Sequence, residues 1–153
     1  MKGYYKNEED TAKALQLHSD GKVWLHTGDM FSKDKDGYIY FRQRNSRIII
    51  CGGYNVYATQ VEDAIDACPA VAQSCVVGLR DRVYGQKVIA FVVLNNKDAD
   101  KEPVKDKIME CCKNNLSENS LPHEIIFRED LPVTNLGKID YLSLEKEINN
   151  IKE

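Results

Sequence analysis

The sequence predicts an α+β fold, and three patterns of apolar residues predict it. Residues 88–94, Val-Ile-Ala-Phe-Val-Val-Leu, are apolar without a break, which is typical of a strand in the middle of a sheet. Residues 72–79 form a second β-rich run, and a polar stretch separates the two. Apolar residues at helical spacing follow residue 59 and again residue 103. We therefore expect a small mixed sheet packed with helices.

Composition limits the possible partners. The 153-residue chain is 42% hydrophobic and 29% charged, which suits one compact domain or one domain with an appendage. Its formal net charge of -3 comes from 21 basic and 24 acidic side chains without a long run of one sign, so no nucleic acid or anionic membrane is expected as a partner. The sequence shows neither an apolar run that approaches a membrane span nor the apolar core of a signal peptide.

The first part of the chain predicts a short helix followed by a β-hairpin. Residues 11–15 are the most helical, and Asp20-Gly21 ends the helix and turns the chain. The strand-like runs 23–27 and 38–41 are joined through 33–37, whose Asp-Gly ending is good turn chemistry, so we expect these two runs to pair.

A connector follows the hairpin. Residues 42–47 contain three arginines and do not read as a core element. We therefore place a domain boundary there and divide the chain into 1–45 and 46–153.

The second region opens with a strand, a turn and a helix. Residues 47–51 form a short apolar strand, Gly52-Gly53 a tight turn, and 54–57 an extended return. Thr59 and Glu62 fit a capping box, in which their side chains would satisfy free backbone donors in the first turn of a helix. The apolar residues of this helix are Val61, Ala64, Ile65 and Cys68, and Pro69 stops it.

Further elements follow the two apolar strands. A polar loop at 95–102 leads to an amphipathic helix at 103–116, with Pro103 near its first turn. Residues 125–127 predict a last short strand. A terminal helix is marked by Tyr141, Leu144, Ile148 and Ile151.

The cysteines and histidines predict no disulfide and no metal site. The five cysteines contain no C-x-x-C pair and are odd in number, so we expect all of them to be reduced, as in a cytoplasmic protein. The three histidines stand apart from one another and from the cysteines at no spacing typical of metal ligands.

Four features could carry chemistry, and each has a plain structural alternative. Asp29 could accept hydrogen bonds from both hydroxyls of a ribose, or be a turn aspartate. Arg44 could bind a phosphate or the same hydroxyls, or be a solvated surface arginine. Gly52 and Gly53 could let an extended ligand approach closely, or form only a hairpin turn. Lys138 could bring an ammonium to a phosphate under attack, or be an ordinary lysine beside a helix-capping glycine.

The order and spacing of these features along the chain are more informative than any one of them alone. Residues 24–29, 36–44, 50–62 and 131–138 together resemble the carboxy-terminal part of the adenylate-forming enzymes. That superfamily includes acyl-CoA and aryl-CoA synthetases, peptide-synthetase adenylation domains and firefly luciferase. The resemblance covers nearly the whole chain. It implies that 1–45 is the distal end of a large adenylation domain, with the hairpin as its remnant, and that 46–153 is the carboxy-terminal lid domain.

The resemblance also implies a role for each candidate residue. Asp29 matches the aspartate that holds the ribose hydroxyls of ATP, and Arg44 matches an arginine that reaches the nucleotide. Ser46 falls at the hinge of the lid, where the family usually has aspartate or lysine. Gly52 and Gly53 match the loop that lines the pantetheine tunnel. Lys138 matches the lysine that touches the acyl carboxylate and the α-phosphate.

The implied reaction has two steps. A carboxylate attacks the α-phosphorus of ATP, and because both are anionic, a cation such as Lys138 lowers their repulsion. Pyrophosphate leaves with Mg²⁺, which the missing amino-terminal domain would mainly bind, and the thiol of CoA then attacks the acyl-AMP. The lid must move between the steps. The implied partners are that large domain, a small carboxylic acid and CoA.

Several alternatives stay open from the sequence. Residues 52–57 look most like acyl-CoA synthetases, whereas 137–140 also resemble domains that load an amino acid or D-alanine onto a carrier protein. A stand-alone, non-catalytic binding module would be a different class, and a reading frame that continues upstream of Met1 would argue against it. Loss of function is disfavoured because Asp29, Arg44 and Lys138 are all present. By itself the chain is expected to be inactive.

Overall fold

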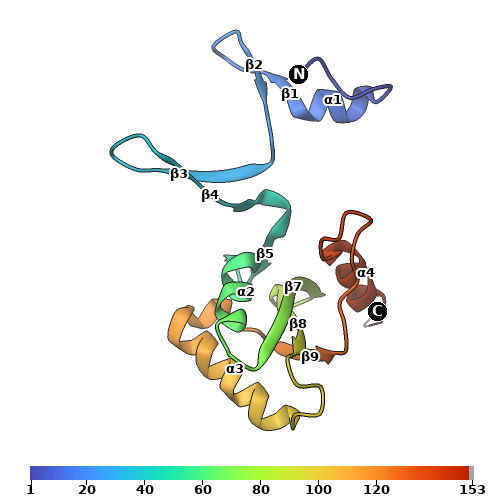
Figure 1. Cartoon of the computed structure of the whole chain (residues 1–153). Helices are drawn as coiled ribbons and strands as arrows, with labels where there is room; N and C mark the ends of the chain where they lie inside the picture. Colours follow the sequence, from blue (N-terminus) through green and yellow to red (C-terminus); the bar gives the residue numbers. More distant parts are fainter. Residues whose placement is uncertain (152–153) are drawn as a thin grey trace. The chain divides into compact units, whose positions relative to one another are not determined.

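The computed structural model describes residues 1–151, leaving aside the side chains of Arg42, Gln43 and Ser46, and it divides into two compact units (Figure 1). Unit 1 is Met1–Ser46 and unit 2 is Arg47–Glu153. The division falls next to the boundary expected from the sequence. We describe each unit by itself.

Unit 1 contains one short helix and two separate hairpins. Its elements are α1 (Glu8–Ala14), β1 (Leu15–Leu17), β2 (Val23–Leu25), β3 (Asp29–Lys33) and β4 (Ile39–Arg44). β1 pairs with β2, and β3 pairs with β4, both antiparallel. The predicted pairing of 23–27 with 38–41 is therefore wrong, although the turn between Lys33 and Ile39 was placed correctly.

The first hairpin forms because Asp20 closes its turn. The Asp20 carboxylate accepts hydrogen bonds from the backbone N–H of Lys22 and from Nε1 of Trp24, both at 3.0 Å. This closes the loop locally and leaves β2 beside β1. Asp34 acts similarly in the second hairpin, where it accepts from the backbone N–H of Tyr38 at 2.9 Å.

The hairpins of unit 1 expose much apolar surface. More than two fifths of each of these side chains is exposed: Leu17, Val23, Trp24, Leu25, Phe31, Tyr38, Ile39, Tyr40 and Phe41. Such surface is typical of a segment that packs against another element.

Unit 2 is built on one mixed five-stranded sheet. Its strands are β5 (Ile48–Cys51), β6 (Tyr54–Tyr57), β7 (Val71–Asp81), β8 (Gly85–Leu94) and β9 (Glu124–Arg128). The order is β6-β5-β8-β7, with β9 parallel to β8 and the other pairs antiparallel. β8 is therefore the central strand, as its continuous apolar sequence predicted.

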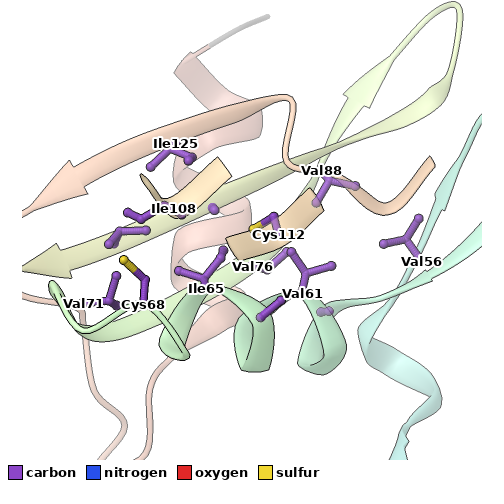
Figure 2. Close-up of a cluster of buried hydrophobic side chains, with 14 of the residues drawn as sticks. Val56, Val61, Ile65, Cys68, Val71, Val76, Val88, Ile108, Cys112 and Ile125 are labelled. Carbon is purple, nitrogen blue, oxygen red and sulfur yellow. The ribbon is translucent and has the colours of Figure 1, made fainter. Parts of the chain in front are cut away.

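Helices cover both faces of this sheet, and this explains why residues 88–94 of β8 are all apolar. The buried residues form two clusters. One joins α2 (Ala58–Asp66) and α3 (Lys101–Asn115) to the alternate strand residues Val88, Ala90 and Val92 (Figure 2). The other joins α4 (Tyr141–Ile151) to the intervening residues Ile89 and Phe91. Successive side chains of a strand point to opposite faces, so both faces of β8 are dry.

The predicted capping box of α2 is wrong. The helix begins at Ala58, so Thr59 lies inside it, and the capping residue Tyr57 makes no side-chain capping bond. Glu62 instead hydrogen-bonds to Arg47 and to the backbone of β7. The helix itself was correctly predicted, and its residues Val61, Ala64 and Ile65 are buried.

The other connections match the expected pattern. Asp100 caps α3 by accepting from the backbone N–H of Glu102, and Pro103 lies in its first turn. A short 3-10 helix, η2 (Glu118–Ser120), leads to β9, and another, η1 (Asn45–Arg47), spans the boundary between the units. None of the helices described in residues 1–151 is long and apolar enough to cross a membrane.

Candidate functional site

Lys138 lies on an exposed loop between β9 and α4. The backbone N–H of Thr134 donates to the carbonyl of Lys138 at 2.7 Å, and the backbone N–H of Gly137 donates to the carbonyl of Thr134 at 2.9 Å. Gly137 has φ +74°, a left-handed conformation that glycine adopts without strain. Val133 and Ile139 close the base of the loop as an isolated β-bridge. The backbone of Lys138 is thus fixed while its side chain faces solvent.

Asp140 joins this loop to α4. Its carboxylate accepts from the hydroxyl of Ser143 at 2.7 Å and from the backbone N–H of Ser143 at 3.2 Å. The Ser143 contacts lower the pKa of Asp140 below its usual value. An anionic side chain at this end also suits the helix dipole. The ammonium of Lys138 forms no hydrogen bond or ion pair within the described part of the chain.

Asp29 and Arg44 lie together at the open ends of β3 and β4. They are partners in the antiparallel register, and Nε of Arg44 is 3.2 Å from Oδ1 of Asp29. Their contact is an ion pair without hydrogen-bond geometry, since Oδ1 has no hydrogen-bond partner. The Arg44 side chain is 67% exposed and that of Asp29 only 20%. The structure thus brings the two predicted nucleotide ligands together.

Gly52 and Gly53 form the tight turn between β5 and β6. Both have positive φ, +58° and +83°, which explains why glycine occupies both positions. The backbone N–H of Gly52 donates to the carbonyl of Tyr84 at 2.8 Å, which ties the turn to the β7–β8 hairpin. A side-chain carbon added at Gly53 would meet no atom within 4 Å. The turn presents open backbone to solvent.

The candidates are divided between the units. Asp29 and Arg44 belong to unit 1, whereas Gly52, Gly53 and Lys138 belong to unit 2, where they occupy different loops. The backbone of Ser46 lies in η1, and its side chain is outside the described residues. The geometry of the candidate residues is therefore defined separately for unit 1 and for unit 2.

Sequence reasoning missed an ion pair beside the boundary. Nη1 of Arg47 donates to Oε2 of Glu62 at 2.9 Å, and Nη2 donates to Oε1 of the same carboxylate. Burial disfavours the charge of Arg47, but the hydrogen bond and charge of Glu62 outweigh it and raise the pKa of the guanidinium. The sequence placed Arg47 at the end of a connector and the start of a short strand, without a partner for its charge. No local signal could have shown its partner, which is 15 residues away.

Two of the buried thiols, Cys75 and Cys112, are poorly suited to chemistry. All five cysteines are free, in line with the expectation of reduced thiols. Burial and the neighbouring Glu62 raise the pKa of Cys75 to about 12, and burial and Cys111 raise that of Cys112 to about 11. Such thiols hold little of the reactive thiolate near neutral pH.

The histidines require one correction. His18 and His26 do not stand apart, because the first hairpin brings their Nε2 atoms to 2.7 Å. The residues described by the structure nevertheless contain no group of three or more His, Cys, Asp or Glu side chains that could hold a metal ion.

The comparison with known families decides the identity of the chain. Residues 60–138, from α2 to the candidate lysine, match the AMP-binding enzyme C-terminal domain. The chain belongs to this family. The AMP-binding C-terminal domain thus accounts for most of unit 2.

Curated relatives of this AMP-binding C-terminal domain protein are CoA ligases and acyl-activating enzymes. The putative acyl-CoA ligase YdaB of Bacillus subtilis is 40% identical over 139 residues, which cover 91% of the chain and 26% of YdaB. The probable CoA ligase CCL11 of Humulus lupulus is 36% identical over 151 residues, covering 99% of the chain and 26% of CCL11. The chain thus spans about a quarter of the length of these relatives.

Solved structures of adenylate-forming enzymes share the fold. ATP-bound MatB from Rhodopseudomonas palustris is similar with a TM-score of 0.82 and 30% identity, over 99% of this chain and 29% of MatB. MenE from Bacillus subtilis, in complex with the acyl-adenylate intermediate OSB-AMP, has a TM-score of 0.81 and 30% identity, over 95% of this chain and 28% of MenE. The α+β fold and the expected family are both confirmed.

Proposed function

We propose that this chain is the carboxy-terminal lid, with the end of the preceding domain, of an ATP-dependent acid-thiol ligase. The ligase would join a carboxylic acid to AMP with release of pyrophosphate. It would then transfer the acyl group to the thiol of CoA with release of AMP. The exposed ammonium of Lys138, on a loop held by backbone hydrogen bonds, carries this proposal.

Lys138 would act in the first step. The carboxylate oxygen and the α-phosphate repel each other, and a fixed cation between them stabilises the charge that develops as the oxygen–phosphorus bond forms. An ammonium already engaged in an ion pair would have to break that pair first. Lys138 is free of one within the described chain, so its charge is available.

The other candidates would bind the substrates. Asp29 and Arg44 present a carboxylate and a guanidinium side by side, which suits the paired hydroxyls of a ribose and a neighbouring phosphate. The Gly52-Gly53 turn offers a face without side chains along which a pantetheine arm could lie. Mg²⁺ would accompany the pyrophosphate and be bound mainly by the large domain.

CoA is the proposed acceptor because the curated relatives named above are CoA ligases. A carrier protein would be the alternative acceptor, since its pantetheine arm has the same terminal thiol. The chain by itself is expected to catalyse neither step, because the proposed acyl pocket and phosphate loop belong to the large domain.

Pyrophosphate exchange in the full-length enzyme tests the role of Lys138. Lys138→Ala should lower the exchange rate on the order of a hundredfold or more, as loss of one preorganised charge-stabilising group commonly does. Lys146→Ala, which removes a lysine of α4, is the control and should leave the rate unchanged. Full exchange by the Lys138→Ala enzyme would show that the assignment is wrong.

A further inference from the structure

Arg47, the first residue of unit 2, is held by three different elements of that unit. Its guanidinium binds the Glu62 carboxylate of α2 through both terminal nitrogens, and Nη2 also donates to the carbonyl of Val76 in β7 at 3.2 Å. Its Cζ atom lies 5.0 Å from the ring centroid of Tyr141, the first residue of α4. The side chains of Arg47 and Glu62 are only 19% and 14% exposed.

Glu62 completes the arrangement. Oε1 of Glu62 accepts from the backbone N–H of Val76 at 2.8 Å, so Arg47 and Glu62 together satisfy both backbone groups of Val76. β7 is the last strand in its sheet order and pairs with β8 on one side. The ion pair therefore replaces a neighbouring strand at this point of the edge. Half-buried and bidentate, such a pair holds its geometry better than an exposed one.

The contact with Tyr141 connects this anchor to the lysine loop. Tyr141 comes three residues after Lys138, and Asp140 between them caps α4. A cation over an aromatic ring is attractive and directional. Arg47, at the start of unit 2, is thus packed against α4, the helix that follows the Lys138 loop.

Unit 1 has its own anchor on the other side of Ser46. The backbone N–H of Asn45 donates to the carbonyl of Gly28 at 2.8 Å, and Arg44 pairs with Asp29. The neighbours of Ser46 are thus fastened one to each unit. η1 is a short 3-10 segment that connects the two units, a common use of this structure.

We propose that Arg47 is a positioning residue. It fixes the start of the lid, residues 47–51, to α2, β7 and α4, so that rotation at Ser46 moves the Lys138 loop together with the rest of unit 2. This inference rests on the proposed function. If residues 47–51 were held loosely, rotation would change the backbone of β5 and would not fix the position of Lys138. Misplacement of a catalytic group by about 1 Å can lower a rate on the order of a hundredfold.

The first test uses the chain itself and is independent of catalysis. Backbone ¹⁵N relaxation should give order parameters of about 0.85 for the amides of 47–51 in the wild-type chain. Arg47→Ala should lower those of 47 and 48 below about 0.6. The matched control is Arg128→Ala, because Arg128 also makes an ion pair with α4, through Glu147, and lies 5.3 Å over the Phe91 ring, but is far from the boundary in sequence. Unchanged order parameters in Arg47→Ala would overturn the inference.

The second test uses the full-length enzyme, with adenylation and thioester formation measured separately. Arg47→Ala should lower kcat of both steps by about tenfold or more, because unit 2 is no longer held in its productive position. KM for ATP should change little, because the proposed ATP-binding residues Asp29 and Arg44 are still present. Arg47→Lys, which keeps the charge and one hydrogen bond, should recover part of the rate. Arg128→Ala should not reproduce the effect.

The outcomes separate the two proposals. If the wild-type enzyme performs neither step but Arg47→Ala still loosens 47–48, the proposed function fails and the anchor stands. If the wild-type enzyme performs both steps and Arg47→Ala behaves like Arg128→Ala, the positioning role fails and the proposed function stands. An Arg47→Ala effect confined to KM would also count against positioning.

Discussion

Asp29 and Arg44 face each other across β3 and β4, with Nε of Arg44 3.2 Å from Oδ1 of Asp29. The pair lies at the edge of its hairpin, and the arginine side is largely exposed. Water competes for the exposed guanidinium and so weakens the contribution of the pair to folding, whereas the Asp29 carboxylate is largely buried and its Oδ1 accepts no hydrogen bond. Binding is the role proposed for this pair, and stability is the alternative.

Arg44→Ala should separate these two roles. We expect the free energy of unfolding of the chain to change by less than about 1 kcal/mol, as for other exposed pairs. In the full-length enzyme KM for ATP should rise about 10-fold to 100-fold, the usual effect of losing a hydrogen bond from a charged group. Lys13→Ala, which breaks the exposed pair with Glu9 in the same unit, is the control for stability. A large loss of stability in Arg44→Ala alone would mean that the pair is structural.

Gly53→Trp should act on the second step of the proposed reaction. A bulky side chain on the open turn would obstruct a pantetheine arm, so thioester formation should fall far more than adenylation. Gly21→Trp is the matched control, because Gly21 also has positive φ and open space but lies in a turn of unit 1. Equal losses of both half-reactions in Gly53→Trp would argue against a role in thiol access.

Ile65→Ala should destabilise unit 2. Ile65 is fully buried between α2 and the sheet, as Figure 2 shows, and removing its methyl groups would leave a cavity. We expect a loss of about 2–5 kcal/mol in urea denaturation. Ile50→Ala on β5, whose side chain is 54% exposed, should cost much less. Similar losses for both variants would show that the cluster around Ile65 is not the core.

The charge of Asp140 should make the cap of α4 sensitive to acid. Hydrogen bonds from Ser143 lower the pKa of Asp140 below the ordinary value of 3.8. A depressed pKa means that the ionised cap stabilises the fold above the ordinary pKa and that this contribution is lost as pH falls through the folded value. The ¹³C shift of the Asp140 carboxyl should therefore titrate below pH 3.8. Ser143→Ala should move the midpoint upward, and an unchanged midpoint would contradict this explanation.

The elements with strong local patterns were predictable. Residues 88–94 of β8 are all apolar because helices cover both faces of the sheet, and α2 and α3 bury the residues with helical spacing. The Gly52-Gly53 turn needs positive φ at both residues, and glycine is the residue that permits it. In each case the pattern that predicts the element lies in the residue types of the element itself.

The errors occurred where a partner had to be chosen. The predicted end of the first helix at Asp20-Gly21 is wrong, because α1 ends at Ala14 and Leu15–Leu17 is a strand that pairs with Val23–Leu25 across the Asp20 turn. Glu62 fits a capping box by its spacing from Thr59, but its carboxylate is taken by Arg47 and Val76. The sequence spacing of His18 and His26 likewise concealed their contact across the first hairpin.

By itself the sequence determined the family, the α+β class and the candidate residues Asp29, Arg44, Gly52, Gly53 and Lys138, because each depends on residue type and order along the chain. Tertiary structure alone decided that Asp29 and Arg44 pair, and that Arg47 is held by Glu62, Val76 and Tyr141. The physical reason is that a charged side chain has many possible partners along a sequence. Only the packing of strands and helices brings one of these partners close to the charge and keeps the other possible partners away from it.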